Sequence, residues 1–102
     1  PTAIFACNDE TAAAACSAAH KRGLRIPEDM AIVGFDDVYL ATAIWPSLTT
    51  VRQPYLEMAR RSISVLAHMR EKSSENDVQL RHVLPYSIIE RESSSLSPKG
   101  EI

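Results

Sequence analysis

Two short apolar segments, separated by an alanine-rich stretch, are the feature that most constrains the fold of this chain. Residues Ala3 to Cys7 and Met30 to Phe35 are almost entirely apolar, which is typical of strands buried on both faces of a parallel sheet. Between them, Glu10 to Arg22 has small residues at helical spacing and ends before Gly23, which predicts a helix. Strand, helix and strand in this order predict a βαβ unit with parallel strands.

The second half of the chain predicts a short strand, a long helix and a broken strand. Leu48 to Val51 is rich in β-branched residues and predicts a third strand. Pro54 suits the first position of a helix, and the apolar stripe that follows it has helical spacing. Val78 to Ile88 alternates between apolar and polar residues, which predicts a half-exposed strand that Pro85 interrupts.

Composition narrows the class of protein. The chain has 102 residues, of which 45% are hydrophobic and 24% charged, as in a globular domain. The net charge of −2 argues against a basic surface for nucleic acid or membranes. No apolar run reaches the roughly 20 residues of a membrane-spanning helix, and no signal peptide is visible. Two cysteines, Cys7 and Cys16, are too few for a disulfide scaffold, and we expect both to be buried thiols.

Polar side chains follow each predicted parallel strand where the strand ends. Asn8 follows the first strand, Asp36 the second and Gln53 the third, and Tyr55 comes two residues later. Because the carboxyl ends of parallel strands meet at one edge of a sheet, we expect these residues to lie close together. Amide, carboxylate and aromatic groups suit a polyhydroxyl or heterocyclic ligand. The alternative is that Asn8 or Asp9 only caps a helix and that Asp36 only begins a turn.

No group of residues predicts catalysis, a metal site or a cofactor. Val38 stands where aspartyl phosphotransferases need a second carboxylate, two residues after Asp36. The three histidines, His20, His68 and His82, have no metal-ligand spacing. The chain also lacks a Gly-x-Ser-x-Gly turn and a glycine-rich phosphate loop. We therefore predict that it is not an enzyme, although an α/β enzyme with an aspartate at the sheet edge is the rival from another class.

Five short segments of the sequence are informative because of their order and spacing. They are PTAIFACND at 1–9, GLRIPED at 23–29, VGFDD at 33–37, PSLTTVRQP at 46–54, and LP at 84–85 followed by IERES at 89–93. In this order and at this spacing, they resemble the LacI/GalR family of bacterial transcription regulators. The resemblance covers about residues 1–95.

The resemblance implies an α/β fold and a division of the chain. The fold would be a Rossmann-like three-layer sandwich of the periplasmic binding protein-like I type, with only its C-terminal portion in this chain. Residues 1–51 would belong to the C-terminal lobe. Residues 52–92 would supply a crossover helix and strand that complete the N-terminal lobe, and 93–102 would be a flexible tail. The helix after Pro54 would then lack a partner for its apolar stripe, so we expect the chain to self-associate.

The resemblance also implies a function and its site residues. The chain would be the effector-binding and dimerisation segment of a cytoplasmic, DNA-binding regulator, in which a small molecule, such as a sugar or related metabolite, controls operator binding allosterically. Asn8, Asp36 and Gln53 would bind the effector, and Tyr55 would pack on its ring. DNA would be contacted only by an N-terminal helix-turn-helix absent from this chain, and no membrane partner is implied.

A homodimer is the second partner that the resemblance implies. Its interface would include Ala13 and Cys16 on the first helix, and Ala43 and Ile44 in the loop after Asp37. The nearest alternative is a periplasmic sugar-binding protein of the same fold. The PSLTTVRQP segment favours the regulator.

Overall fold

The structure is a computed structural model that describes residues 1–71 and 80–96. The chain divides into two compact units: unit 1 comprises 1–52 together with 87–102, and unit 2 comprises 53–86. Of the C-terminal part of unit 1, residues up to 96 are described. No helix in the described ranges combines the length and the apolar content that crossing a membrane requires.

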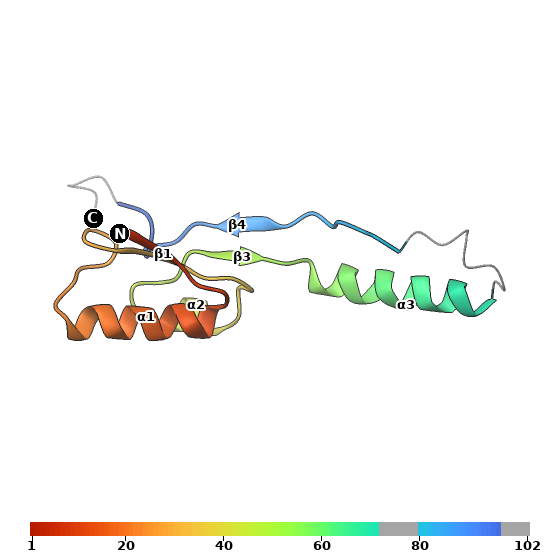
Figure 1. Ribbon diagram of the computed structural model, residues 1–102, viewed down its shortest axis with the longest axis horizontal. Helices are drawn as coiled ribbons and strands as arrows, with labels where there is room; N and C mark the ends of the chain where they lie inside the picture. Colours follow the sequence, from red (N-terminus) through yellow and green to blue (C-terminus); the bar gives the residue numbers. More distant parts are fainter. Residues whose placement is uncertain (72–79, 97–102) are drawn as a thin grey trace. The chain divides into compact units, whose positions relative to one another are not determined.

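Unit 1 begins with the βαβ unit that the sequence predicts. β1 (Ala3–Phe5) and β2 (Ala31–Val33) pair in parallel, with Ile4 opposite Ile32. α1 (Asp9–Lys21) connects them (Figure 1). The prediction of a parallel pair joined by a helix is therefore confirmed.

Two further strands extend this arrangement. Parallel bridges join Val33 to Thr49 and Asp36 to Arg52, so the chain that enters β3 (Thr50–Arg52) runs beside β2 in the same direction. β4 (Ser87–Ile89) pairs antiparallel with β3. The strand predicted from residue 78 is thus formed only beyond Pro85. Residues 80–86 are irregular, and 78 and 79 lie outside the described residues.

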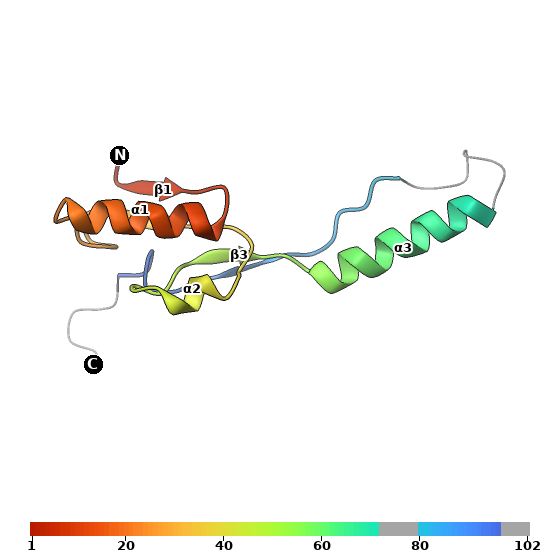
Figure 2. The same cartoon turned by 90° about the horizontal axis from the view of Figure 1, so that it is seen from below.

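The helices of unit 1 cover one face of these strands. α1 and α2 (Leu40–Ala43) lie on the same side of β1 and β3 (Figures 1 and 2). Small side chains allow α1 to approach the strands closely, because alanine and cysteine add little bulk between backbones. The buried core consists of Ala6, Ala12, Cys16, Ala19, Ile26, Ile32, Ala41 and Leu48.

The prediction that both parallel strands are buried on both faces is wrong for β1. Phe5 is 69% exposed and Ile4 is 37% exposed, whereas Ile32 on β2 is fully buried. The reason lies in the neighbours of β1: in the described part of unit 1 it pairs with β2 alone, and helices cover only one face of the strands. Unit 1 therefore contains, among its described residues, two of the three layers of the predicted sandwich.

The segment that begins at Ser93 differs from the predicted flexible tail. Ser93 is completely buried. Its backbone N–H donates to the carbonyl of Ser47 at 2.9 Å, and its own carbonyl accepts from the N–H of Ile32 at 3.0 Å. A serine-rich sequence looks like a tail when read locally, but here the serine backbone pairs with chain from two other parts of unit 1. Residues 97–102 of the predicted tail lie outside the described residues.

Unit 2 contains α3 (Tyr55–Glu71), which follows Pro54 as predicted. The carbonyl of Pro54 accepts the N–H of Met58 at 2.9 Å and so begins the helical hydrogen bonding. No residue of α3 is buried. The large side chains of the predicted apolar stripe are 37–67% exposed, namely Leu56, Met58, Ile63, Leu66 and Met69.

Candidate functional site

Two of the four predicted ligand residues lie at the carboxyl ends of the paired strands β1 and β2. Asn8 comes three residues after the end of β1, and Asp36 comes three residues after the end of β2. The backbone N–H of Asp36 donates to the carbonyl of Val51 at 2.9 Å. The structure therefore places both residues at the edge of the sheet where a ligand is expected in this type of fold.

The turn after β2 has an unusual backbone. Asp36 has φ 112° and Asp37 has φ 55°, so two successive residues with side chains adopt conformations that favour glycine. Such conformations persist only when surrounding contacts determine them, and they are concentrated at functional sites.

Asn8 has the structural role that was the alternative to ligand binding. It is the N-cap of α1, with an extended φ of −155°, and its side-chain oxygen accepts the N–H of Thr11 at 2.8 Å. An asparagine side chain also has an amide nitrogen with two donor hydrogens. Capping occupies the oxygen and leaves these donors for another partner.

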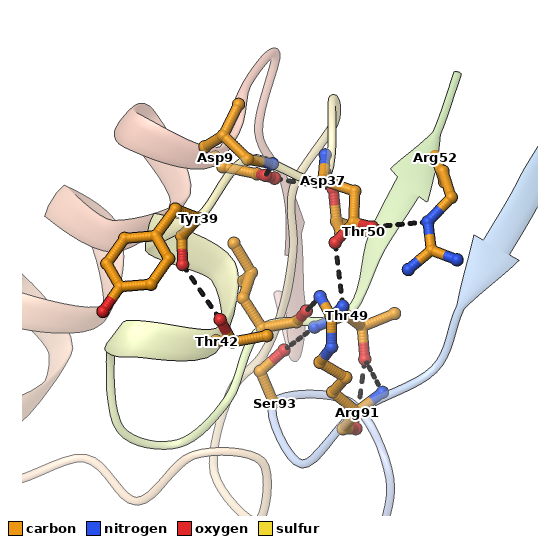
Figure 3. A network of polar contacts seen from close by, with 11 residues as sticks. Asp9, Asp37, Tyr39, Thr42, Thr49, Thr50, Arg52, Arg91 and Ser93 are labelled. Carbon is orange, nitrogen blue, oxygen red and sulfur yellow. Dashed lines mark hydrogen bonds and ion pairs between the residues drawn. The ribbon is translucent and has the colours of Figure 1, made fainter. Parts of the chain in front are cut away.

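Asp9 connects the start of α1 to both strands that follow. It is fully buried. One carboxylate oxygen accepts the hydroxyl of Thr50 at 2.6 Å, and the other accepts the backbone N–H of Val38 at 2.8 Å (Figure 3). Its own backbone N–H donates to the carbonyl of Phe35 at 3.0 Å. Asp9 thereby fixes both sides of the Asp36–Asp37 turn.

Gly34 is required by the position of Asp9. A side chain at this position would overlap an Asp9 carboxylate oxygen, and would lie 2.9 Å from Cδ2 of Leu48 and 3.2 Å from Cα of Asp9. The glycine of the VGFDD segment therefore makes room for the buried carboxylate.

Asp37 accepts hydrogen bonds from two arginines, a group that we call the Asp37 clamp (Asp37, Arg52 and Arg91). Nε of Arg52 lies 2.6 Å from one carboxylate oxygen, and Nη2 of Arg91 lies 2.8 Å from the other. The Asp37 side chain is only 9% exposed. Its burial alone would raise the pKa of the carboxyl, but the hydrogen bonds and charges of Arg52 and Arg91 outweigh this effect and hold the pKa below its usual value.

The clamp arginine Arg91 comes from a segment that is itself bound tightly to unit 1. Its side chain is 15% exposed, and Nη1 donates to the carbonyl of Leu48 at 3.0 Å. Its backbone N–H donates to the hydroxyl of Thr49 at 2.8 Å. Two residues later, the Ser93 hydroxyl accepts the N–H of Thr49 at 2.8 Å and donates to the carbonyl of Ile32. Within the described residues, every buried side-chain nitrogen and oxygen has a hydrogen-bond partner.

The other two predicted ligand residues belong to unit 2. Nε2 of Gln53 donates to the hydroxyl of Tyr55 at 3.2 Å, and the Tyr55 side chain is 49% exposed. These two residues contact each other, and each has further interactions. A joint site with Asn8 and Asp36 remains a prediction.

The predicted dimer residues differ in exposure. Ala43 is exposed, and Ala13 and Ile44 are half-buried. Next to them, Trp45 is 72% exposed and stacks on the ring of His20 with centroids 5.3 Å apart. Cys16, by contrast, is 3% exposed and belongs to the core of unit 1. Its side chain is part of the core of unit 1, and its place in a dimer interface stays a prediction.

The two cysteines also differ from each other. Cys16 is buried as predicted, and its burial raises the pKa of the thiol, an effect that its backbone hydrogen bond partly offsets. Cys7 is exposed, contrary to the prediction, because it follows β1, which is covered on one face only. Its sulfur lies 3.7 Å from the hydroxyl of Thr11.

Sequence reasoning did not predict which residues hold the turn. They are Asp9, for which only a helix-capping role was considered, together with Asp37, Thr50, Arg91 and Ser93. All five lie within the VGFDD, PSLTTVRQP, IERES and PTAIFACND segments. Only their position within these segments could have indicated that they matter, because no local sequence pattern predicts the ion pair between Arg91 and Asp37.

Comparison with known proteins agrees with this architecture. Residues 1–94 match the sequence model of the periplasmic binding protein-like domain. The chain is 47% identical over 66 residues to the HTH-type transcriptional repressor PurR of Haemophilus influenzae, which covers 65% of this chain and 20% of that protein. It is 41% identical over 95 residues to the HTH-type transcriptional regulator DegA of Bacillus subtilis, which covers 93% of this chain and 28% of that protein.

The fold of this chain is also similar to that of a solved transcriptional repressor. The lac repressor dimer bound to operator and the anti-inducer ONPF superposes with a TM-score of 0.82 at 30% identity, which covers 92% of this chain and 32% of that chain. The chain thus spans about a fifth to a third of the length of these proteins.

These matches define a class of protein, the α/β proteins with a periplasmic binding protein-like fold. The chain belongs to the family of periplasmic binding protein-like domains, and its relatives are transcriptional regulators of the LacI type. The predicted fold class and the predicted resemblance are confirmed, and the regulator is favoured over the periplasmic transport protein.

Proposed function

We propose that this chain is an effector-binding and dimerisation segment of a cytoplasmic bacterial regulator of the LacI type, which acts by binding and not by catalysis. A small molecule bound at the sheet edge would shift an equilibrium between conformations and thereby change the affinity for operator DNA. DNA would be contacted by an N-terminal helix-turn-helix outside this chain. The proposal is supported by the similarity of this chain to the lac repressor, which forms a dimer that binds an operator and an anti-inducer.

The observation that carries the proposal is the position of Asp36. It lies at the carboxyl end of β2 in a backbone conformation that side chains rarely adopt, with φ 112°. Asp9 and the Asp37 clamp hold the residues on both sides of it. A carboxylate on a backbone held in this way loses less conformational freedom when it accepts hydrogen bonds from ligand hydroxyls.

The other ligand residues add complementary groups. Asn8 would donate from its amide nitrogen, because its oxygen caps α1. Gln53 and Tyr55 are proposed as further ligand residues: the amide of Gln53 would donate and accept hydrogen bonds, and the ring of Tyr55 would pack on the ligand. A carboxylate, amides and an aromatic ring suit a sugar or a related polyhydroxyl metabolite.

The division into lobes follows from the same proposal. Residues 1–51 would form part of the C-terminal lobe, and 52–92 would supply a helix and a strand to the N-terminal lobe. The boundary between units 1 and 2 at Arg52 supports the first limit. Because β4 and Ser93 pack in unit 1, the contribution of unit 2 would end before Ser87.

The proposed homodimer would use the surface around α2. Ala43 is exposed, Ala13 and Ile44 are half-exposed, and the large ring of Trp45 lies beside them. Large aromatic side chains such as that of Trp45 are enriched in the central part of protein interfaces.

The test is the variant Asp36→Ala in the full-length protein that contains this chain. We expect operator binding to be retained, and release of the operator by a panel of mono- and disaccharides to be lost. Asp29→Ala is the matched control, because Asp29 is an aspartate of unit 1 that pairs only with Arg25 among the described residues. Sugar-induced release that is unchanged in Asp36→Ala would refute the proposal.

A further inference from the structure

The turn that carries Asp36 is held by every backbone N–H along it. The N–H of Asp36 donates to the carbonyl of Val51 at 2.9 Å, and that of Asp37 donates to the hydroxyl of Thr50 at 3.2 Å. The N–H of Val38 donates to the Asp9 carboxylate at 2.8 Å. These bonds fix the backbone from the side of α1 and β3, yet two successive residues at positive φ still oppose the arrangement.

The Asp37 side chain adds a further restraint, and its two arginines are not equivalent. The Arg52 side chain is 56% exposed, whereas that of Arg91 is 15% exposed. An ion pair on the surface contributes little to stability. Removing one partner of a buried pair has a much larger effect, because it leaves the other charge poorly compensated.

Arg91 is also the arginine that is itself held in place. Its guanidinium binds both the Asp37 carboxylate and the carbonyl of Leu48. Its backbone exchanges hydrogen bonds with the hydroxyl of Thr49, and Ser93 anchors the same segment in the core. A planar guanidinium with several donors suits this geometry better than an ammonium group does.

We infer that Arg91 is a positioning residue: by holding Asp37, it keeps Asp36 in the left-handed turn at the carboxyl end of β2. Arg91 itself would not contact the ligand. The inference rests on the proposed function in one respect: an effect of Arg91 on ligand affinity requires that Asp36 contacts the ligand.

The experiment compares four proteins in the full-length chain: wild type, Arg91→Met, Arg91→Lys and the control Arg52→Met. Hydrogen exchange measured by mass spectrometry reports on the peptide that covers residues 35–38 and on a peptide of α1. Affinity for the panel of mono- and disaccharides is measured in parallel. The first readout needs no known ligand.

Arg91→Met should speed exchange in residues 35–38 by about tenfold or more, because a charge-assisted hydrogen bond is lost. Exchange in α1 should change much less, and sugar affinity should fall by a similar factor. Arg91→Lys should restore part of the slow exchange in residues 35–38 and part of the sugar affinity, since one ammonium donor can still reach Asp37. Arg52→Met should change exchange in the turn by less than about threefold.

The results distinguish a failure of the inference about Arg91 from a failure of the proposed function. Unchanged exchange in residues 35–38 of Arg91→Met would overturn the inference, and so would equal acceleration in α1, which would mean that Arg91 merely stabilises unit 1. If Asp36→Ala leaves sugar-induced release of the operator unchanged while Arg91→Met loosens the turn, the proposed function fails and the positioning of the turn by Arg91 stands. If no sugar in the panel binds, the exchange result alone decides the inference.

Discussion

Units 1 and 2 have similar fractions of apolar residues, but their described residues bury these side chains very differently. In unit 1, Ile32 and Leu48 are completely buried, and so are the polar residues Asp9 and Ser93. In unit 2, α3 has no buried residue, and Leu66 is 61% exposed. Helical spacing of apolar residues therefore predicts a helix and the face that it must bury, but not what covers that face.

The two main helices meet different requirements. α1 presents small side chains, which pack closely on β2 within the same unit. α3 presents leucine, isoleucine and methionine, which need a deep partner surface, and the described residues of unit 2 provide none. Local contacts such as the Glu57–Arg61 pair at 3.7 Å support α3 only weakly.

Gly34→Val is the change with the largest expected effect, and it acts on unit 1 alone. The added side chain would overlap the buried Asp9 carboxylate and Leu48, so we expect the cooperative unfolding transition of unit 1 to be lost. Gly23→Ala is the control: nothing lies within 4 Å of an added Cβ there, so only the strain of a side chain at positive φ is added, without any overlap. Urea unfolding followed by circular dichroism measures both, and a normal transition in Gly34→Val would contradict the described packing.

A matched pair of leucines tests the comparison between the units. Leu48→Ala in unit 1 should lower the free energy of unfolding by about 2–5 kcal/mol, because Leu48 is fully buried. Leu66→Ala in α3 should lower it by less than about 0.5 kcal/mol, because Leu66 is 61% exposed. Light scattering on the same samples should show that Leu66→Ala, and not Leu48→Ala, reduces self-association of the 102-residue chain. Equal losses of stability would show that α3 is packed in solution.

Asp37→Asn should lower the stability of unit 1 by about 1.5–3 kcal/mol at neutral pH, since hydrogen bonds to a charged group are lost. The pKa of Asp37 is lowered in the folded protein from its ordinary 3.8. The stability that this lowering provides is therefore fully present above pH 3.8, and is lost as the pH falls through the folded value.

Urea unfolding at several pH values checks this prediction. The difference between wild type and Asp37→Asn should shrink below about pH 4. Asp29→Asn is the control: Arg25 hydrogen bonds lower the pKa of Asp29 to about 2, but the Arg25 side chain is 72% exposed, so solvent screens the pair. A pH-independent difference for Asp37→Asn would contradict the assigned ion pairs.

Two substitutions of Asn8 have the smallest expected effect on stability and separate its two roles. Asn8→Ala removes the cap of α1 and should cost about 1 kcal/mol. Asn8→Ser retains a capping oxygen and should be nearly neutral, but it removes the amide donors. If Asn8 binds the ligand as proposed, both variants should weaken sugar binding in a titration. Wild-type affinity in Asn8→Ser would show that Asn8 is only a cap.

The parts of the fold that the sequence predicts correctly are those with local causes. Apolar runs place β1 and β2, an asparagine cap and a terminal glycine delimit α1, and Pro54 marks the start of α3. The exposure of Phe5 is not predictable in this way, because it depends on which elements cover β1.

For the candidate site, the positions of Asn8 and Asp36 at the sheet edge follow from strand order, which local sequence patterns predict. The contact between Arg91 and Asp37 and the burial of Ser93 do not, because each joins segments that are distant in the chain. In isolation, a serine after a charged run resembles a tail.

Residue-resolved hydrogen exchange of the wild-type chain is the decisive measurement, because it shows whether the turn that carries Asp36 is ordered by unit 1 alone. At a concentration at which light scattering shows a monomer, we expect strong protection for the amides of Asp37 and Val38, comparable to that of α1, and weak protection throughout α3. Rapid exchange at Asp37 and Val38, or protection of α3 equal to that of α1, would contradict this expectation.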